Sequence, residues 1–222
     1  MNKQQLIYRF FVTTVTVALV FLTGCAGSAS IGKNQHEKML AQGATYNDAA
    51  LQAYVNRVGQ RLVANSDKPN STFTFTVIDS PDINAFAAPG GYIYINRGLL
   101  AYLENEAELA AVLAHEIGHV TASHHNRQQA ASVTNSVVAT TAYVLTGSGD
   151  LASASNMYGS ELISGYGRDM ELEADGLGAQ YMHQSGYDTD SLLEVIGVLK
   201  DQEQFQRMQS KNGGKPVASY HG

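Results

Sequence analysis

Residues 105–119 read NEAELAAVLAHEIGH, and this stretch decides the fold of the chain. Asn105 and Glu108 have the spacing of a capping box, in which two side chains satisfy the first free backbone amides of a helix. The alanines and leucines that follow favour the helical conformation. We therefore expect a helix that begins near Glu106 and continues through His119 and beyond.

The motif HEIGH occupies residues 115–119 of this expected helix. Because residues four apart lie on one face, one turn apart, the imidazoles of His115 and His119 can reach a single zinc ion. Glu116 is rotated by about 100° from His115, so it stands beside the metal, where it can take a proton from the attacking water. An accidental match is expected in roughly one chain of this length in a hundred. The motif therefore predicts a zinc-dependent hydrolytic site.

A tetrahedral catalytic zinc site needs a third protein ligand and one open position. ELEAD at residues 171–175 offers three carboxylates, on a strong helical pattern over residues 168–183. Glu171 and Asp175 share a face, whereas Glu173 is turned by roughly 200° from Glu171 and should face elsewhere. Because the glutamate side chain is longer, we expect Glu171 to be the ligand and Asp175 to accept a hydrogen bond from an imidazole N–H.

The rest of the chain predicts an α+β fold. Apolar residues recur at helical spacing over residues 51–63, after a candidate N-cap at Asn47 or Asp48. Threonine and apolar residues alternate over residues 72–77, and YIYI at residues 92–95 reads as a second strand. The connection between the two strands is rich in turn residues. We expect a mainly helical domain with a small antiparallel sheet beside the HExxH helix.

Residues 1–24 read as a signal peptide. Lys3 and Arg9 form a basic start, and residues 10–22 form an apolar run that is shorter than a full membrane span. The run ends in LTGC at residues 22–25, which resembles a bacterial lipobox that is cut before its cysteine. The alternative is an uncleaved signal anchor. The small residue before the cysteine favours cleavage.

Cys25 is the only cysteine of the chain, so an intramolecular disulfide is excluded. A lipidated cysteine explains its presence, because acyl chains anchor a protein stably to a membrane. Residues 25–30 then form a lipidated, flexible tether, and residues 31–222 form the catalytic domain. Ala26 follows the cysteine where aspartate would retain a lipoprotein in the inner membrane. We expect the periplasmic face of the bacterial outer membrane.

The composition is that of one globular domain, with 44% hydrophobic and 15% charged residues. The formal net charge of -6 argues against a nucleic-acid partner. The remaining histidines have no ligand-like spacing, and we expect solvated or capping roles for all of them, with His124 and His125 at the surface: His36, His124, His125, His183 and His221.

Three further stretches accompany HEIGH in a fixed order: NAFAAPGG at residues 84–91, GLL at residues 98–100, and Arg168 followed by ELEAD. Together they resemble the HtpX and CAAX-prenyl-protease family of zinc endopeptidases. With the lipobox, the likeness extends to the small bacterial outer-membrane metalloprotease lipoproteins of the LoiP and BepA type. The resemblance covers about residues 31–200, which is most of the mature chain.

This resemblance implies an α+β gluzincin fold, one zinc ion per chain and proteolysis of cell-envelope proteins. It makes His115, His119 and Glu171 the metal ligands, Glu116 the catalytic base, and Asp175 the residue that orients a zinc-binding histidine. Such relatives usually continue past a segment like YHG at residues 220–222 into a His-Pro motif and a final helix. The chain stops there, as expected of a C-terminally truncated fragment.

The expected function is hydrolysis of misfolded or unassembled envelope proteins, with the lipid as the contact to the membrane. One alternative is a zinc-bound periplasmic chaperone or assembly factor for outer-membrane proteins with latent protease activity. Another is a lipid-anchored structural protein in which zinc only stabilises the fold.

Overall fold

The computed structural model describes residues 24–132 and 167–197 of the 222-residue chain. Residues 124–132 and 190–197 are helical in addition to the named elements. The named elements follow one another along the chain as α2 (Gly24–Ala41), α3 (Ala49–Ala64), β1 (Thr74–Ile78), β2 (Ala85–Ala88), β3 (Tyr92–Asn96), α4 (Arg97–Leu100), α5 (Glu106–Thr121) and α8 (Arg168–Gln184). The predicted signal peptide and the C-terminal tail lie outside the described residues, apart from Gly24.

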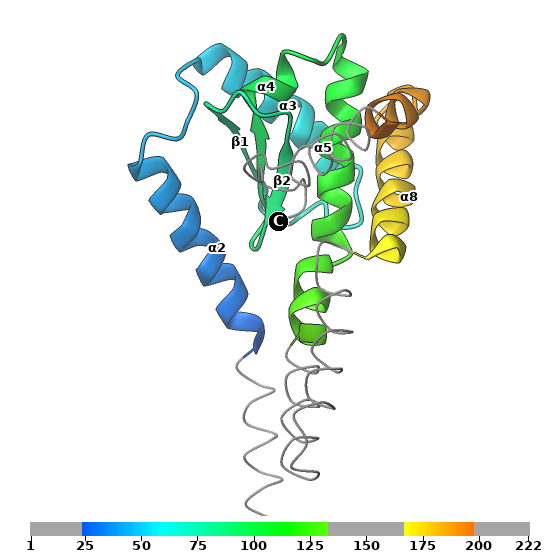
Figure 1. Ribbon diagram of the computed structural model, residues 1–222. Helices are drawn as coiled ribbons and strands as arrows, with labels where there is room; N and C mark the ends of the chain where they lie inside the picture. Colours follow the sequence, from blue (N-terminus) through cyan, green and yellow to red (C-terminus); the bar gives the residue numbers. More distant parts are fainter. Residues whose placement is uncertain (1–23, 133–166, 198–222) are drawn as a thin grey trace, which may run out of the picture.

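The described part is mainly helical with a small sheet, which confirms the expected fold class (Figure 1). Asp48 caps α3 by accepting a hydrogen bond from the Leu51 amide, and Asn105 caps α5 by accepting one from the Glu108 amide. The Glu108 carboxylate in turn accepts from the Asn105 side chain and the Glu104 backbone. These local caps explain why the helix starts were readable from the sequence.

The sheet is mixed, in the order β1-β3-β2. β1 pairs with β3 in parallel, and β2 pairs with β3 in antiparallel fashion. The expected antiparallel pairing of the strands near residues 74 and 92 is therefore wrong. The strand β2 lies between them in the sequence and returns the chain, so β3 runs in the same direction as β1. β2 reaches β3 through Gly90 and Gly91, whose φ angles of 88° and 83° allow a tight turn. β2 escaped prediction because alanine has low strand propensity.

One apolar core joins α3, α5 and the sheet. The buried face of α3 carries Val55, Val58 and Leu62, which meet Val77 of β1 and the apolar residues of α5. Nearly every residue of α5 from Leu109 onward is buried, including both histidines and the glutamate of HEIGH. The HExxH helix is thus the central element of the domain, and its polar side chains are held in a rigid, apolar setting.

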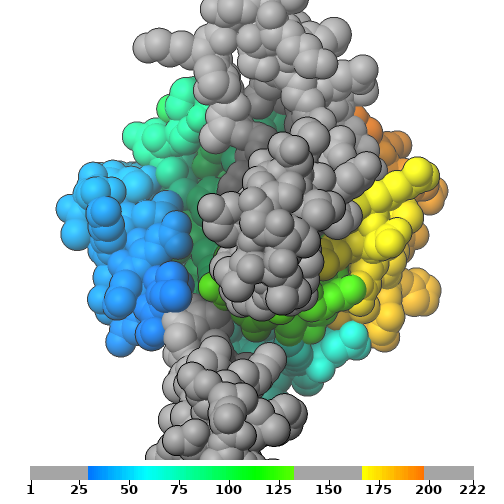
Figure 2. Space-filling model, turned by 60° about the horizontal axis from the view of Figure 1, so that its bottom comes forward, coloured from blue at the N-terminus to red at the C-terminus, as the bar shows by residue number. Residues whose placement is uncertain are grey.

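Helix α2 begins at Gly24, so the segment expected to be a flexible tether is helical. The helix contacts the sheet through His36, whose Nδ1 lies 3.0 Å from the Tyr94 hydroxyl and whose ring stacks on Tyr92 at 4.5 Å. His36 is therefore half-buried rather than solvated. Figure 2 shows α2 and α8 on opposite sides of the described part. Among the described residues, no helix has both the length and the apolar character needed to cross a membrane.

Candidate metal centre

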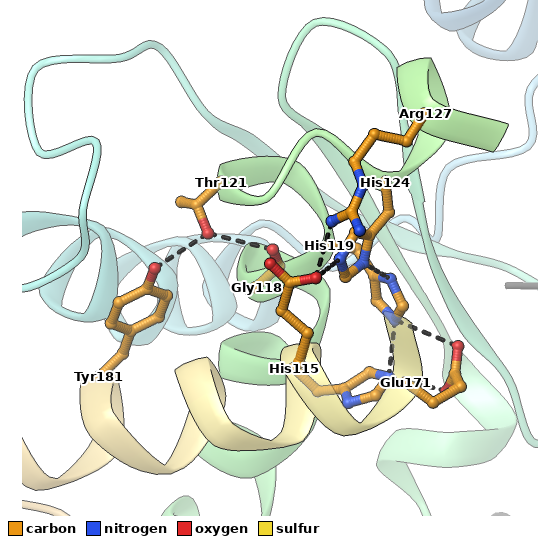
Figure 3. Close-up of polar contacts among 9 residues, drawn as sticks. His115, Gly118, His119, Thr121, His124, Arg127, Glu171 and Tyr181 are labelled. Carbon is orange, nitrogen blue, oxygen red and sulfur yellow. Dashed lines mark hydrogen bonds and ion pairs between the residues drawn. The ribbon is translucent and has the colours of Figure 1, made fainter. Parts of the chain in front are cut away.

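Two helices bring three metal-ligand side chains to one point. The Nε2 atoms of His115 and His119, one turn apart on α5, lie 2.9 Å from each other. Glu171, in the first turn of α8, places Oε2 3.7 Å from His115 Nε2 and Oε1 3.6 Å from His119 Nε2 (Figure 3). Ligand atoms of all three residues lie within 4.8 Å of one another. This is close enough for one metal ion to be shared.

Glycine allows α8 to approach α5 closely enough for Glu171 to reach the histidines. A Cβ atom at Gly118 would lie 2.9 Å from the Ala174 carbonyl oxygen. A Cβ atom at Gly178 would lie 3.2 Å from the backbone nitrogen of His115. Both contacts are with backbone atoms, which cannot move aside cheaply. The small residues on the two facing surfaces therefore determine the distance between Glu171 and the two histidines.

Asp175 and the neighbouring carboxylates act on His115. The Nδ1–H of His115 donates to Asp175 Oδ1 at 2.9 Å, which turns Nε2 toward His119. Burial lowers the pKa of His115, but the hydrogen bond to Asp175 and the charges of Glu116 and Glu171 outweigh it, so the pKa is raised overall. Glu116 is only 1% exposed and lies beside this ring in a site from which bulk water is largely excluded.

His124 contacts a candidate metal ligand in a way that the sequence did not indicate. It is fully buried, and its Nδ1 lies 2.8 Å from His119 Nδ1, so the expected surface position is wrong. That expectation assumed that the helix continues past His119. Instead α5 ends at Thr121, and Ser123 has a φ angle of 58°, so the chain changes direction and His124 folds back. No glycine or proline marks this turn, and nothing in the sequence signals it. His125 is exposed, as expected.

Glu173 lies outside the cluster of His115, His119 and Glu171 but forms hydrogen bonds with two residues beside it. Its Oε2 accepts hydrogen bonds from His124 Nε2 at 3.2 Å and from Arg127 Nη1 at 2.7 Å. These two hydrogen bonds lower the pKa of Glu173, with Arg127 as the larger cause. Helix geometry correctly predicts that Glu173 points away from Glu171. It does not reveal that His124 and Arg127 lie on that side of the helix.

A cavity of about 380 Å³ opens beside His119. It lies between the β2–β3 turn, the loop that precedes β1 and the last turn of α5. Its walls include Phe73, Ala88, Pro89 and Val120, with the Lys68 side chain among them. The Lys68 ammonium donates to the Val120 carbonyl at 3.3 Å and to Ser123 Oγ at 3.2 Å. The cavity is mostly apolar and adjoins the candidate ligands.

A family model described as peptidase family M48 matches residues 49–220 of the chain. The beta-barrel assembly-enhancing protease of Yersinia pestis is 35% identical over 182 residues, which cover 76% of this chain and 36% of the relative. The mitochondrial metalloendopeptidase OMA1 of Schizosaccharomyces pombe is 34% identical over 197 residues, 82% of this chain and 55% of the relative. The metalloprotease YcaL of Escherichia coli is 25% identical over 236 residues, 93% of this chain and 88% of the relative. The chain thus spans about a third of the length of the beta-barrel assembly-enhancing protease that it matches.

Proposed function

Since the chain belongs to peptidase family M48, we propose that it is a zinc metalloprotease that hydrolyses internal peptide bonds of misfolded or unassembled cell-envelope proteins. The observation that carries the proposal is the meeting of His115, His119 and Glu171 beside the buried Glu116. The family match agrees with the resemblance seen in the sequence motifs.

We assign one zinc ion to His115 Nε2, His119 Nε2 and the Glu171 carboxylate. Two imidazole nitrogens and one carboxylate oxygen are a donor set that zinc peptidases use, and three protein ligands leave one position open. When bound, zinc polarises a carbonyl group and makes water more acidic. The closely packed backbones of α5 and α8 hold the donors in place, so little reorganisation is needed.

Glu116 is the general base of this proposal. Its carboxylate takes a proton from the attacking water and returns it to the leaving amine nitrogen, so one group serves both steps. Burial strengthens its interactions with the reacting atoms, because nearby solvent no longer screens them. Asp175 holds the His115 ring through the 2.9 Å hydrogen bond, and so keeps Nε2 directed at the shared point.

The substrate backbone is proposed to lie along β2. This strand stands at the edge of the described three-stranded sheet, and an extended peptide can pair with such an edge. The cavity beside His119 then accepts one substrate side chain, and its apolar walls favour an apolar one. Unfolded proteins expose both extended backbone and apolar side chains, which supports them as the substrate class.

The proposed place of action is the periplasmic face of the outer membrane, with Cys25 as the lipid attachment site. The signal-like residues 1–24 and the lipobox support it. The name of the Yersinia pestis relative links that protein to β-barrel assembly, and supports unassembled outer-membrane proteins as substrates here. The same name favours a second candidate function, a zinc-bound assembly factor with latent protease activity.

Incubation of the full-length protein in detergent with a permanently unfolded protein separates the two functions. We expect new termini within the substrate by mass spectrometry, loss of cleavage with a chelator, and recovery on addition of zinc. The matched control is Glu116→Gln, which keeps the three ligands. Binding of the unfolded protein without cleavage by the zinc-loaded wild type would reject the endopeptidase and support the assembly factor.

A further inference from the structure

A continuous row of side chains runs from His119 to the surface of the molecule. His119 Nδ1 and His124 Nδ1 are 2.8 Å apart (Figure 3). His124 Nε2 and Glu173 Oε2 are 3.2 Å apart, and Arg127 Nη1 lies 2.7 Å from the same oxygen. The side chains of His119 and His124 are 1% and 0% exposed, whereas those of Glu173 and Arg127 are 43% and 48% exposed. The row therefore leads from the buried site to the surface.

The chemistry of the donors and acceptors allows one proton arrangement in this row. When the Nε2 of His119 is used as a ligand, the neutral ring carries its proton on Nδ1. His119 then donates to His124 Nδ1, so that His124 carries its own proton on Nε2. That proton is donated to Glu173, and Arg127 donates to the same carboxylate. Each of the three contacts has one donor and one acceptor.

The position of His124 is held by the backbone as well as by its partners. Ser123 adopts a left-handed conformation, which is unfavourable in a residue other than glycine. The Lys68 ammonium bonds both Ser123 Oγ and the Val120 carbonyl, on the two sides of the turn. Such a conformation persists only where the surroundings determine it. The turn that delivers His124 to His119 is therefore built into the fold.

We propose that His124, oriented by Glu173 and Arg127, is a positioning residue that holds His119 in the tautomer and ring orientation required of a metal ligand. The inference rests on the proposed role of His119 in the zinc site. Its geometric basis is that the row ends on Nδ1 of His119 while Nε2 of the same ring faces His115.

The two histidines of α5 are then positioned in different ways by a single helix. Asp175 contacts His115 Nδ1 directly, whereas Glu173 acts on His119 Nδ1 through the imidazole of His124. Glu171 faces both Nε2 atoms, so three of the four acids of α8 serve three separate tasks. A movement of α8 would disturb the ligand and both positioning contacts together, so the metal affinity depends on the docking of α8.

The experiment measures zinc affinity of the full-length protein in detergent by competition with a chromophoric chelator. We expect His124→Leu, which keeps an apolar side chain in the buried position but removes both nitrogens, to bind zinc on the order of 10 to 100-fold more weakly. The matched control is His125→Leu, the exposed neighbour, whose zinc affinity should equal that of the wild type.

A pair of amide variants tests orientation rather than folding. Asparagine at position 124 places an oxygen close to the position of Nδ1, where it can accept from His119, whereas glutamine places its amide near Nε2 and misses His119. We expect His124→Asn to bind zinc on the order of 10-fold more tightly than His124→Gln. The absorption bands of the cobalt-substituted protein should match the wild type in the asparagine variant and shift in the glutamine variant.

The outcomes separate this inference from the proposed function. Equal zinc affinity in the wild type, His124→Leu and both amide variants, with unchanged cobalt spectra, overturns the role of His124 and leaves the zinc site intact. Equal affinity in the wild type and in His115→Ala overturns the zinc site itself, and the positioning role with it. If His124→Leu does not fold, the zinc affinities of His124→Asn and His124→Gln decide, because both variants keep a polar side chain of similar size.

Discussion

The carbonyl oxygen of Ala174 on α8 lies 2.9 Å from the position that a Cβ atom would take at Gly118 of α5. Gly118 stands between the two histidines of HEIGH, so this contact determines how near α8, and with it Glu171, comes to these histidines. The two x positions of an HExxH motif take no part in the chemistry. In this chain Gly118 occupies the second of them, and helix packing constrains it to glycine.

The first prediction is that Gly118→Ala moves α8 away from α5. Overpacking of this kind costs about 1–3 kcal/mol of folding stability. The Glu171 oxygens, now 3.6 and 3.7 Å from the two histidine nitrogens, would move with the helix, and zinc affinity should fall. Thermal unfolding with and without zinc measures both effects.

The matched control is Gly176→Ala, because a Cβ atom at Gly176 meets no atom within 4 Å. Alanine is the better helix former, so this variant should gain up to about 1 kcal/mol and keep its zinc affinity. The same zinc affinity in Gly118→Ala and Gly176→Ala would contradict the packing argument.

The elements with local signals were predictable. The capped helix that was expected near residues 106–119 is α5, Glu106–Thr121, and the pattern over residues 168–183 is α8, Arg168–Gln184. Their boundaries depend on nearby caps and periodicity, which a single sequence contains. The helical face shared by Glu171 and Asp175 follows from the 3.6-residue repeat, and both side chains reach histidines of α5.

The features that depend on tertiary contacts were not predictable. The alanine-rich β2 becomes a strand only because β3 is available for pairing. His124 folds back onto His119 through a turn at Ser123, which Lys68 holds from a distant loop. Helix geometry alone predicts that Glu173→Ala changes little. Because Glu173 contacts His124, we instead expect the Glu173→Ala variant to bind zinc more weakly than the wild type, with a smaller loss of affinity than in His124→Leu.

The second prediction concerns the base. Glu116→Gln should retain zinc, because the three ligands are untouched, and should lower the rate of peptide hydrolysis by about 10² to 10⁴-fold. The isosteric amide fills the same buried volume but cannot accept a proton. Cleavage rate and bound zinc are measured on the same preparation. Hydrolysis at the parental rate would show that Glu116 is not the base.

The third prediction concerns alkaline pH. Burial, with a smaller effect of Tyr92, raises the pKa of Tyr94 to about 12. The unfolded chain releases this proton near pH 10. The contribution of Tyr94 to stability is therefore complete below about pH 10 and is lost as the pH rises from 10 through 12. The midpoint of urea unfolding should fall over this range, and fall less in Tyr94→Phe.

Tyr102→Phe is the control for the alkaline experiment, because Tyr102 is 57% exposed and should give the pH dependence of the wild type. Tyr94→Phe also loses the contact with His36 and so starts from a lower stability. The comparison therefore uses the change between pH 10 and 12 and not the absolute midpoint. An equal change in all three proteins would contradict the role of Tyr94.

The fourth prediction concerns the membrane anchor. Cys25→Ser removes the thiol to which lipid would be transferred, so the signal should stay uncleaved and the mature mass should lack the acyl chains. Membrane fractionation and intact-mass measurement test this in cells that express the chain. An unchanged mass and unchanged fractionation would reject lipidation and support an uncleaved signal anchor.

The last prediction separates the acids of α8. Glu171→Ala removes the carboxylate that faces both Nε2 atoms, and should lose zinc and activity together. Asp175→Ala leaves the ligands in place but frees the His115 ring, and should weaken zinc binding on the order of 10 to 100-fold. Asp169→Ala, an exposed acid of the same helical turn as Glu171, is the control and should bind zinc normally. Metal analysis of the purified variants decides, since full zinc content in Glu171→Ala would remove that residue from the ligand set.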